Sequence, residues 1–185
     1  MLPEMLLCIM VLSTSEKDRK MIQAGILSDT HITSVNERFR ESVDTAFSDC
    51  DIIFHAGDIT SLSVLELFQP KTIYAVHGNM CDIEVHRSLP ESRVVELGNT
   101  TVGLCHGAGP RHNIEERMWS RFPEADCIIY GHTHQPVCHR TGGILFINPG
   151  SFYLRTPHGT PASYAILTLD DSGCHANLHT LSDKR

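Results

Sequence analysis

The spacing of hydrophobic and polar positions along this chain predicts its secondary structure. From Met21 onward, short apolar runs rich in Ile and Val alternate with amphipathic stretches, which predicts an α/β architecture with largely buried strands. Phe39, Val43 and Phe47 fall at helical spacing and predict one helix, and residues 62–68 and 114–122 predict two more. The predicted strands are residues 22–27, 51–54, 72–76, 93–97, 102–105, 126–130, 137–140, 144–147, 163–169 and 175–181.

Turn residues complete this pattern, which becomes almost entirely β after Tyr130. Residues 142–143 and 171–173 each separate two short strands as a hairpin would, and residues 98–99 predict an earlier turn. No repeat or linker divides the chain, so we expect one domain, residues 21–185, after a loose N-terminal extension, residues 1–20. Met21 could mark the start of the folded domain, or even of translation.

Composition narrows the class of function. The 185 residues suit one globular domain with one active site. With 22 acidic against 15 basic residues and no Lys/Arg run, the chain is a poor binder of long nucleic acid, and we expect a small substrate. The apolar run at residues 5–12 is too short to span a membrane and resembles a signal peptide only weakly.

Cysteine and histidine usage adds two expectations. The seven cysteines are scattered and contain no C-x-x-C pair, so neither a disulfide framework nor a zinc ribbon fits, and a cytoplasmic location is favoured. The 12 histidines are many for this length, and several stand beside Gly or Asp, as metal ligands often do.

Polar clusters stand where several of the apolar runs end. In open α/β sheets, ligands collect beyond the carboxyl ends of the strands, so we expect these clusters to converge. Glycines within them permit tight turns and a close approach of the backbone to ions or phosphate. The clusters are Ser28-Asp29-Thr30-His31, His55-Ala56-Gly57-Asp58, His77-Gly78-Asn79, His106-Gly107 and Gly131-His132-Thr133-His134.

The residue types in these clusters indicate a metal centre. Apart from His55 and His77, the clusters hold two carboxylates, one amide oxygen and four imidazoles. These are too many ligands for one tetrahedral ion but suit two divalent ions that share a bridging carboxylate, for which Asp58 is the natural choice. A set without thiolate favours Mn, Ni, Co, Fe or Zn over Ca or Mg, and Mn is the favoured assignment. Two such ions, offset by two aspartates and a bridging hydroxide, attract a phosphodiester anion and activate their shared water as the nucleophile.

The motifs D-x-H, G-D, G-N, H and G-H-x-H, in this order, resemble those of the calcineurin-like metallophosphoesterase superfamily over nearly the whole chain from Met21. The short length and residues 148–151 and 163–165 are similar to its small bacterial and archaeal phosphodiesterase branch. The resemblance implies a two-sheet β-sandwich flanked by helices. It also implies that one ion is held by Asp29, His31, Asp58 and His134 and the other by Asp58, Asn79, His106 and His132, with Asp58, Asn79 and His106 in catalytic roles.

The chain departs from this pattern at one position. Much of the superfamily has a His after the motif Asn that helps to protonate the leaving group, whereas Met80 follows Asn79 here. General acid catalysis contributes about 10²–10⁴-fold, so we expect slow turnover of diesters with poor leaving groups and a preference for activated or strained ones. His112 is a candidate substitute acid.

Other residues near the motifs have simpler interpretations. His55 and His77 precede ligands within apolar runs and are expected to support them rather than to bind metal. Residues 148–151 are expected to form a tight turn. Whether this turn also lines the site is left open, with equal weight on the two interpretations. Arg155 and Arg111 are candidate phosphate clamps, although an exposed Arg is the commoner case.

Three other functions stay open at the level of sequence. A retromer subunit that resembles this branch uses the same fold as a protein-interaction scaffold with a degraded metal site, but here the ligand set is complete. A nuclease is disfavoured by the acidic balance, and a phosphomonoesterase can be separated only by assay. A homo-oligomer is also left open, and no membrane partner is expected.

Overall fold

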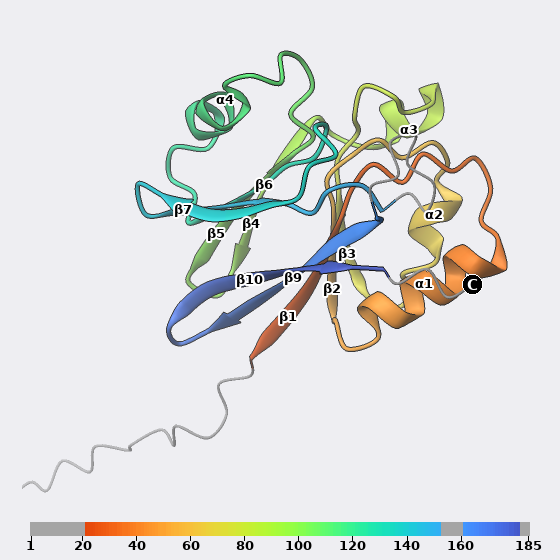
Figure 1. Ribbon diagram of the computed structural model, residues 1–185, viewed down its shortest axis with the longest axis horizontal. Coiled ribbons are helices and arrows are strands. Elements are labelled where there is room, and N and C mark those ends of the chain that lie inside the picture. Colours follow the sequence, from red (N-terminus) through yellow and green to blue (C-terminus); the bar gives the residue numbers. More distant parts are fainter. Residues whose placement is uncertain (1–20, 153–160, 182–185) are drawn as a thin grey trace, which may run out of the picture.

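The computed structural model describes residues 21–152 and 161–181, so the proposed extension of residues 1–20 lies outside the described residues. Two five-stranded sheets pack face to face, with helices on their outer faces (Figure 1). The helices are α1 (Glu37–Phe47), α2 (Ser63–Glu66), α3 (Ile83–Ser88) and α4 (Ile114–Arg121). The strands are β1 (Ile22–Leu27), β2 (Ile52–His55), β3 (Thr72–Ala75), β4 (Ser92–Leu97), β5 (Thr100–Cys105), β6 (Cys127–Ile129), β7 (Val137–Thr141), β8 (Ile144–Asn148), β9 (Ser163–Asp170) and β10 (Gly173–Thr180).

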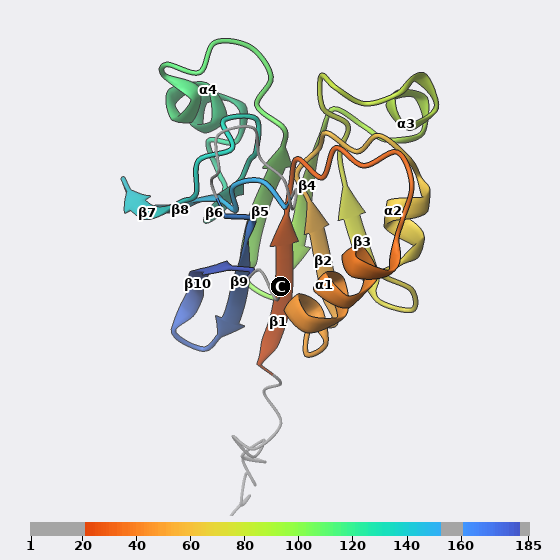
Figure 2. The same cartoon turned by 45° about the vertical axis from the view of Figure 1, so that its right-hand side comes forward.

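The strand order is β10-β9-β1-β2-β3 in the first sheet and β4-β5-β6-β8-β7 in the second. Within the first sheet β1, β2 and β3 are parallel, and within the second β5, β6 and β8 are parallel. Antiparallel strands complete both sheets, among them β9, which returns to pair with β1. The parallel strands of each sheet therefore end at one edge of that sheet (Figure 2), and in the sequence the polar clusters follow these strand ends.

Three buried layers hold the fold together. Between the sheets, Ile26, Phe54, Leu104 and Ile129 belong to one apolar cluster. A second cluster packs α1 and its neighbours onto the first sheet, and a third packs α4 onto the second. Burial of this apolar surface is the main driving force for association of the layers. The predicted α/β class and helix-flanked two-sheet sandwich are confirmed.

The predicted secondary structure matches the observed elements closely, with one omission. Each predicted strand has an observed counterpart whose ends differ by at most two residues, and the turns at residues 98–99, 142–143 and 171–172 are present. The hydrophobic pattern did not predict α3, a six-residue helix with a single buried side chain, Val85. Its start is marked by Asp82, whose carboxylate accepts a hydrogen bond from the Val85 amide at 2.8 Å. None of the helices in the described part of the chain is long and apolar enough to cross a membrane.

Candidate metal centre

The seven residues predicted as metal ligands all follow parallel strands, and they come from both sheets. Asp29 and His31 follow β1, Asp58 follows β2 and Asn79 follows β3. The other three follow strands of the second sheet, namely β5 for His106 and β6 for His132 and His134. The site therefore lies where the carboxyl ends of the parallel strands of both sheets meet. The sequence predicted that the clusters at these strand ends converge.

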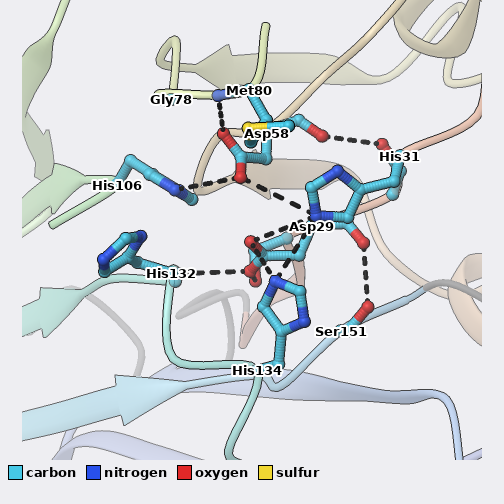
Figure 3. A network of polar contacts seen from close by, with 12 residues as sticks. Asp29, His31, Asp58, Gly78, Met80, His106, His132, His134 and Ser151 are labelled. Carbon is cyan, nitrogen blue, oxygen red and sulfur yellow. Dashed lines mark hydrogen bonds and ion pairs between the residues drawn. The ribbon is translucent and has the colours of Figure 1, made fainter. Parts of the chain in front are cut away.

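Four of these residues form a compact group. The ligand atoms of Asp29, His31, Asp58 and His134 all lie within 4.8 Å of one another. His134 Nε2 lies 3.1 Å from Asp29 Oδ1 and 3.4 Å from His31 Nε2 (Figure 3). A divalent cation suits this mixture of imidazole nitrogens and carboxylate oxygens.

Asp58 lies between this group and His106. Its Oδ2 is 3.7 Å from His31 Nε2 and 3.3 Å from His106 Nε2 (Figure 3). The other oxygen, Oδ1, accepts a hydrogen bond from the Met80 amide at 2.7 Å, which fixes the rotation of the carboxylate. This position fits the predicted role of Asp58 as the ligand shared by two ions.

The chemistry of His106 provides a test of whether a cation fits here. His106 Nδ1 lies 2.8 Å from the Ala56 carbonyl oxygen, which can only accept, so Nδ1 carries the proton. The neutral ring then presents the lone pair of Nε2 to Asp58 Oδ2. His106 Nε2 and Asp29 Oδ1 are both buried, and they lie 3.3 Å from Asp58 Oδ2 and 3.1 Å from His134 Nε2 respectively. Buried lone pairs that face one another are costly unless a cation lies between them, so the residues fit a metal.

His132 and Asn79 are the two remaining predicted ligands. His132 Nε2 lies 2.9 Å from the Gly109 carbonyl oxygen, which leaves Nδ1 as the lone pair able to bind metal. The His132 and His106 ring centroids are 5.3 Å apart. Asn79 is exposed and lines, together with His106, one cavity beside the site. The second ion would therefore have a more open environment than the first.

Backbone strain is concentrated at this site. Six described residues other than glycine have positive φ angles, and five of them are predicted ligands: Asp29 at 53°, His31 at 46°, Asp58 at 55°, His132 at 68° and His134 at 61°. Such conformations are unfavourable for residues with a Cβ and persist where surrounding contacts enforce them, typically at functional sites. This clustering could not be read from the sequence.

Glycines next to the ligands provide space for them. A Cβ on Gly78 would collide with the Asp58 carboxylate, and one on Gly131 would lie 2.9 Å from Asp29 Oδ2. At Gly57, where φ is 95°, an added Cβ would lie 2.7 Å from His106 Nδ1. The G-D, G-N and G-H motifs therefore need glycine for close packing against the ligands, in agreement with the sequence analysis.

Residues 148–151 contact the loops that carry the ligands. The fully buried Asn148 donates from Nδ2 to the Gly131 carbonyl oxygen at 2.8 Å and to Thr133 Oγ1 at 3.0 Å. Ser151 Oγ donates to the Asp29 carbonyl oxygen at 2.9 Å (Figure 3). These contacts show that the turn supports the ligand loops, and whether residues 148–151 also line the site stays a prediction.

Ser28 was not singled out by the sequence analysis. Its hydroxyl lies 2.7 Å from both Asp29 Oδ2 and the Gly150 carbonyl oxygen, so it connects the turn to a ligand. A serine that directly precedes the D-x-H motif is the one sequence signal that could have suggested this role.

Proton affinities in the metal-free protein follow from this geometry. Burial alone would lower the pKa of His106, but the Asp58 and Asp29 carboxylates outweigh burial and raise it. A hydrogen bond with Asp29 raises the pKa of His134, whereas burial lowers the pKa of His31. Burial opposes ionisation of Asp58, but His106 and the Met80 amide keep the Asp58 pKa below its usual value. In the metal-free protein, His106 and His134 therefore bind protons more readily than a free imidazole does.

The remaining predicted residues are placed as follows. His55 is fully buried, and burial lowers its pKa to about 3. Its Nε2 lies 3.4 Å from Oγ1 of Thr30, the residue between the predicted ligands Asp29 and His31. His77 stacks on His86 with ring centroids 4.0 Å apart. His112 is exposed in the loop that follows His106.

Of the two candidate phosphate clamps, one can be placed. Burial lowers the pKa of His132, and the hydrogen bond with the Gly109 carbonyl opposes this. The positive charges of His106 and of the exposed Arg111 lower the pKa further, so Arg111 lies near His132, and its role as a phosphate clamp stays a prediction. Arg155 lies outside the described residues.

Comparison with known proteins agrees with this site. Residues 22–172 match the family model described as the calcineurin-like phosphoesterase superfamily domain. A probable metallophosphoesterase of Methanothermobacter thermautotrophicus is 36% identical over 157 residues, which cover 83% of this chain and 90% of the relative. A phosphodiesterase of Methanocaldococcus jannaschii is 29% identical over 144 residues, or 70% of this chain and 83% of that protein.

A solved structure is also similar. It is a predicted phosphoesterase from Streptococcus pneumoniae, 29% identical, with a TM-score of 0.68 over 87% of this chain and 90% of that chain. The strand-end motifs, the grouped Asp and His side chains and the family match over 22–172 agree. The chain therefore belongs to the calcineurin-like phosphoesterase superfamily, alongside small archaeal and bacterial phosphoesterases.

Proposed function

We propose that this protein is a phosphodiesterase that uses two divalent metal ions, with Mn²⁺ as the first candidate, to hydrolyse small phosphodiesters. The observation that carries the proposal is the group of ligand atoms from Asp29, His31, Asp58 and His134, which lie within 4.8 Å of one another, with His106 Nε2 3.3 Å from the Asp58 carboxylate. A relative from M. jannaschii bears the name phosphodiesterase, which supports the same activity.

The chain's own residues would bind the ions and the substrate. Asp29, His31, Asp58 and His134 would hold one ion, and Asp58, Asn79, His106 and His132 the other. When bound, the two ions lower the pKa of a shared water to supply the nucleophile and polarise the phosphoryl oxygens. The Ala56 carbonyl and the Met80 amide fix the orientation of His106 and Asp58 respectively. Arg111 adds positive charge at the mouth of the site, which favours an anionic substrate.

The preference for activated diesters rests on the residue after Asn79. Met80 is 58% exposed and has no proton to donate to a leaving group. An aryl or cyclic diester needs less help, because its leaving group departs as a stabilised anion or with release of ring strain. His112 is the candidate acid in the adjacent loop. If His112→Ala leaves the ratio of rates on poor and good leaving groups unchanged, that role is refuted.

The experiment is a metal panel on metal-stripped protein. Mn, Ni, Co, Zn and Mg are added singly, and hydrolysis of bis(p-nitrophenyl) phosphate is compared with that of p-nitrophenyl phosphate. Asp58→Asn removes the shared carboxylate, and Asp44→Asn makes the same change at an exposed position of α1. We expect metal-dependent activity, faster on the diester, that Asp58→Asn abolishes and Asp44→Asn keeps.

The other outcomes identify the rival functions. Full activity without metal, or in Asp58→Asn, refutes the two-metal mechanism. Faster hydrolysis of the monoester identifies a phosphomonoesterase. Metal binding without any hydrolysis favours an interaction scaffold of this fold.

A further inference from the structure

A cavity of ≈ 580 Å³ adjoins the half of the site formed by Asn79 and His106. Its volume lies within the range of cavities that bind drug-sized ligands, about 300–1,000 Å³. A phosphate bound at the ions would therefore have room beside it for one of its two ester substituents.

We infer that this cavity binds one ester substituent of the diester and that His86 on α3 selects a planar substituent; this inference rests on the proposed phosphodiesterase function. His77 and His86 both line the cavity, and their rings pack against each other in a tilted stack, with centroids 4.0 Å apart and an angle of 32° between the planes. His77 is partly buried and His86 is exposed, so His86 is the more accessible ring. A flat ring of a substrate can extend this stack.

The position of His86 is fixed by α3. The His86 amide donates to the Asp82 carbonyl oxygen at 3.0 Å, and the buried Val85 anchors the helix to the first sheet. The His77 amide donates to the Pro90 carbonyl oxygen at 3.0 Å, which holds the backbone that carries the second ring. The fold thus fixes where both histidines lie, so a ligand needs to order only their side chains.

The charges around the cavity disfavour cationic ester substituents. Arg121 and Glu91 form an ion pair of 2.7 Å at its wall, so their charges offset one another. Arg117 donates to the carbonyl oxygens of Gly107 and Ala108 at 3.0 Å each, and within the described residues no carboxylate forms an ion pair with it. The cavity therefore keeps positive charge, which disfavours cationic substituents such as aminoalkyl groups and leaves neutral aryl or nucleoside substituents.

The test uses binding of three phosphonates to the metal-loaded protein, measured by calorimetric titration: phenylphosphonate, methylphosphonate and 2-aminoethylphosphonate. We expect the wild-type protein to bind phenylphosphonate about threefold to tenfold more tightly than methylphosphonate, which is the effect of one aromatic stack. The 2-aminoethyl compound should bind most weakly. His86→Ala should remove the phenyl preference and leave methylphosphonate binding unchanged.

The matched control is His179→Ala, which deletes another exposed, stacked histidine. His179 lies on β10 against Tyr164, with ring centroids 5.1 Å apart, and does not line this cavity. Equal affinity of the wild-type protein for the phenyl and methyl compounds, or a phenyl preference that survives in His86→Ala, overturns the inference. Tight binding of the aminoethyl compound overturns the charge argument.

Turnover of bis(p-nitrophenyl) phosphate is measured separately. Binding of phenylphosphonate through His86 without turnover refutes the proposed activity and keeps the cavity assignment. If the diester is hydrolysed but the wild-type protein shows no phenyl preference that depends on His86, the cavity assignment is refuted and the proposed activity stands.

Discussion

Replacing Asn148 by alanine removes an amide that supports the loop of the G-H-x-H motif without touching a predicted ligand. The side chain is fully buried. Its Nδ2 donates to the Gly131 carbonyl oxygen at 2.8 Å and to Thr133 Oγ1 at 3.0 Å, and its Oδ1 accepts from the Gly150 amide at 2.9 Å. Alanine keeps none of these three hydrogen bonds.

The expected magnitude follows from the number of bonds. A net contribution of about 1 kcal/mol per hydrogen bond gives a loss of about 3 kcal/mol in the free energy of unfolding. The two bonds to the motif loop account for about 2 kcal/mol of this, and at 1.4 kcal/mol per factor of ten they correspond to roughly 30-fold weaker metal binding. Loss of a group that orients metal ligands typically weakens binding by about 10–100-fold, which agrees.

The assay is calorimetric titration of Mn²⁺ into metal-stripped protein, with thermal unfolding of the same samples. Asn177→Ala is the matched control, because Asn177 is exposed on β10. We expect the control to bind metal as the wild type does. A folded Asn148→Ala protein with unchanged metal affinity would refute the idea that Asn148 positions the motif loop.

Three further predictions use the same geometry. Gly78→Ala should abolish metal-dependent activity, because its Cβ collides with the Asp58 carboxylate. Gly143→Ala adds a Cβ at a φ of 88° that meets nothing within 4 Å, so it should lower stability but keep activity; equal rates in the two variants would contradict this. Lowering the pH from about 8 to about 6 should weaken metal binding, because protons compete at His106 and His134, whose pKa values are raised in the metal-free protein; a titration series that gives the same affinity at every pH would exclude this competition. Across a series of diesters, rates should fall steeply as the pKa of the leaving group rises, and a flat dependence would show that a general acid is present after all.

The sequence carried strong signals for the strands and for most of the site. Strands such as β1 and β2 are short, mostly apolar runs that lead directly into polar clusters, so both could be recognised from local pattern. Local pattern does not report pairing between distant segments. The antiparallel contact of β9 with β1 joins Ile22 to Leu169, and nothing near either residue specifies it.

Features with weak local signals were missed for a physical reason. Helix α3 buries only Val85, so it has almost no apolar periodicity, and the stack of His86 on His77 depends on it. The sequence left the role of residues 148–151 undecided, because a turn that supports a site and a turn that does not have the same composition. The positive φ angles at Asp29 and Asp58 arise from tertiary contacts, and the sequence contains no pattern for them.

The origin of the ligands in two sheets has a consequence for stability. Asp29 and Asp58 extend from the first sheet and His106 and His134 from the second, so an ion bound among them is a cross-link between the two halves of the sandwich. Metal that binds only the folded chain raises its stability in proportion to the logarithm of metal concentration. A chelator should therefore loosen the contact between the sheets as well as stop the reaction, and hydrogen exchange in β1 and β6 would report the change.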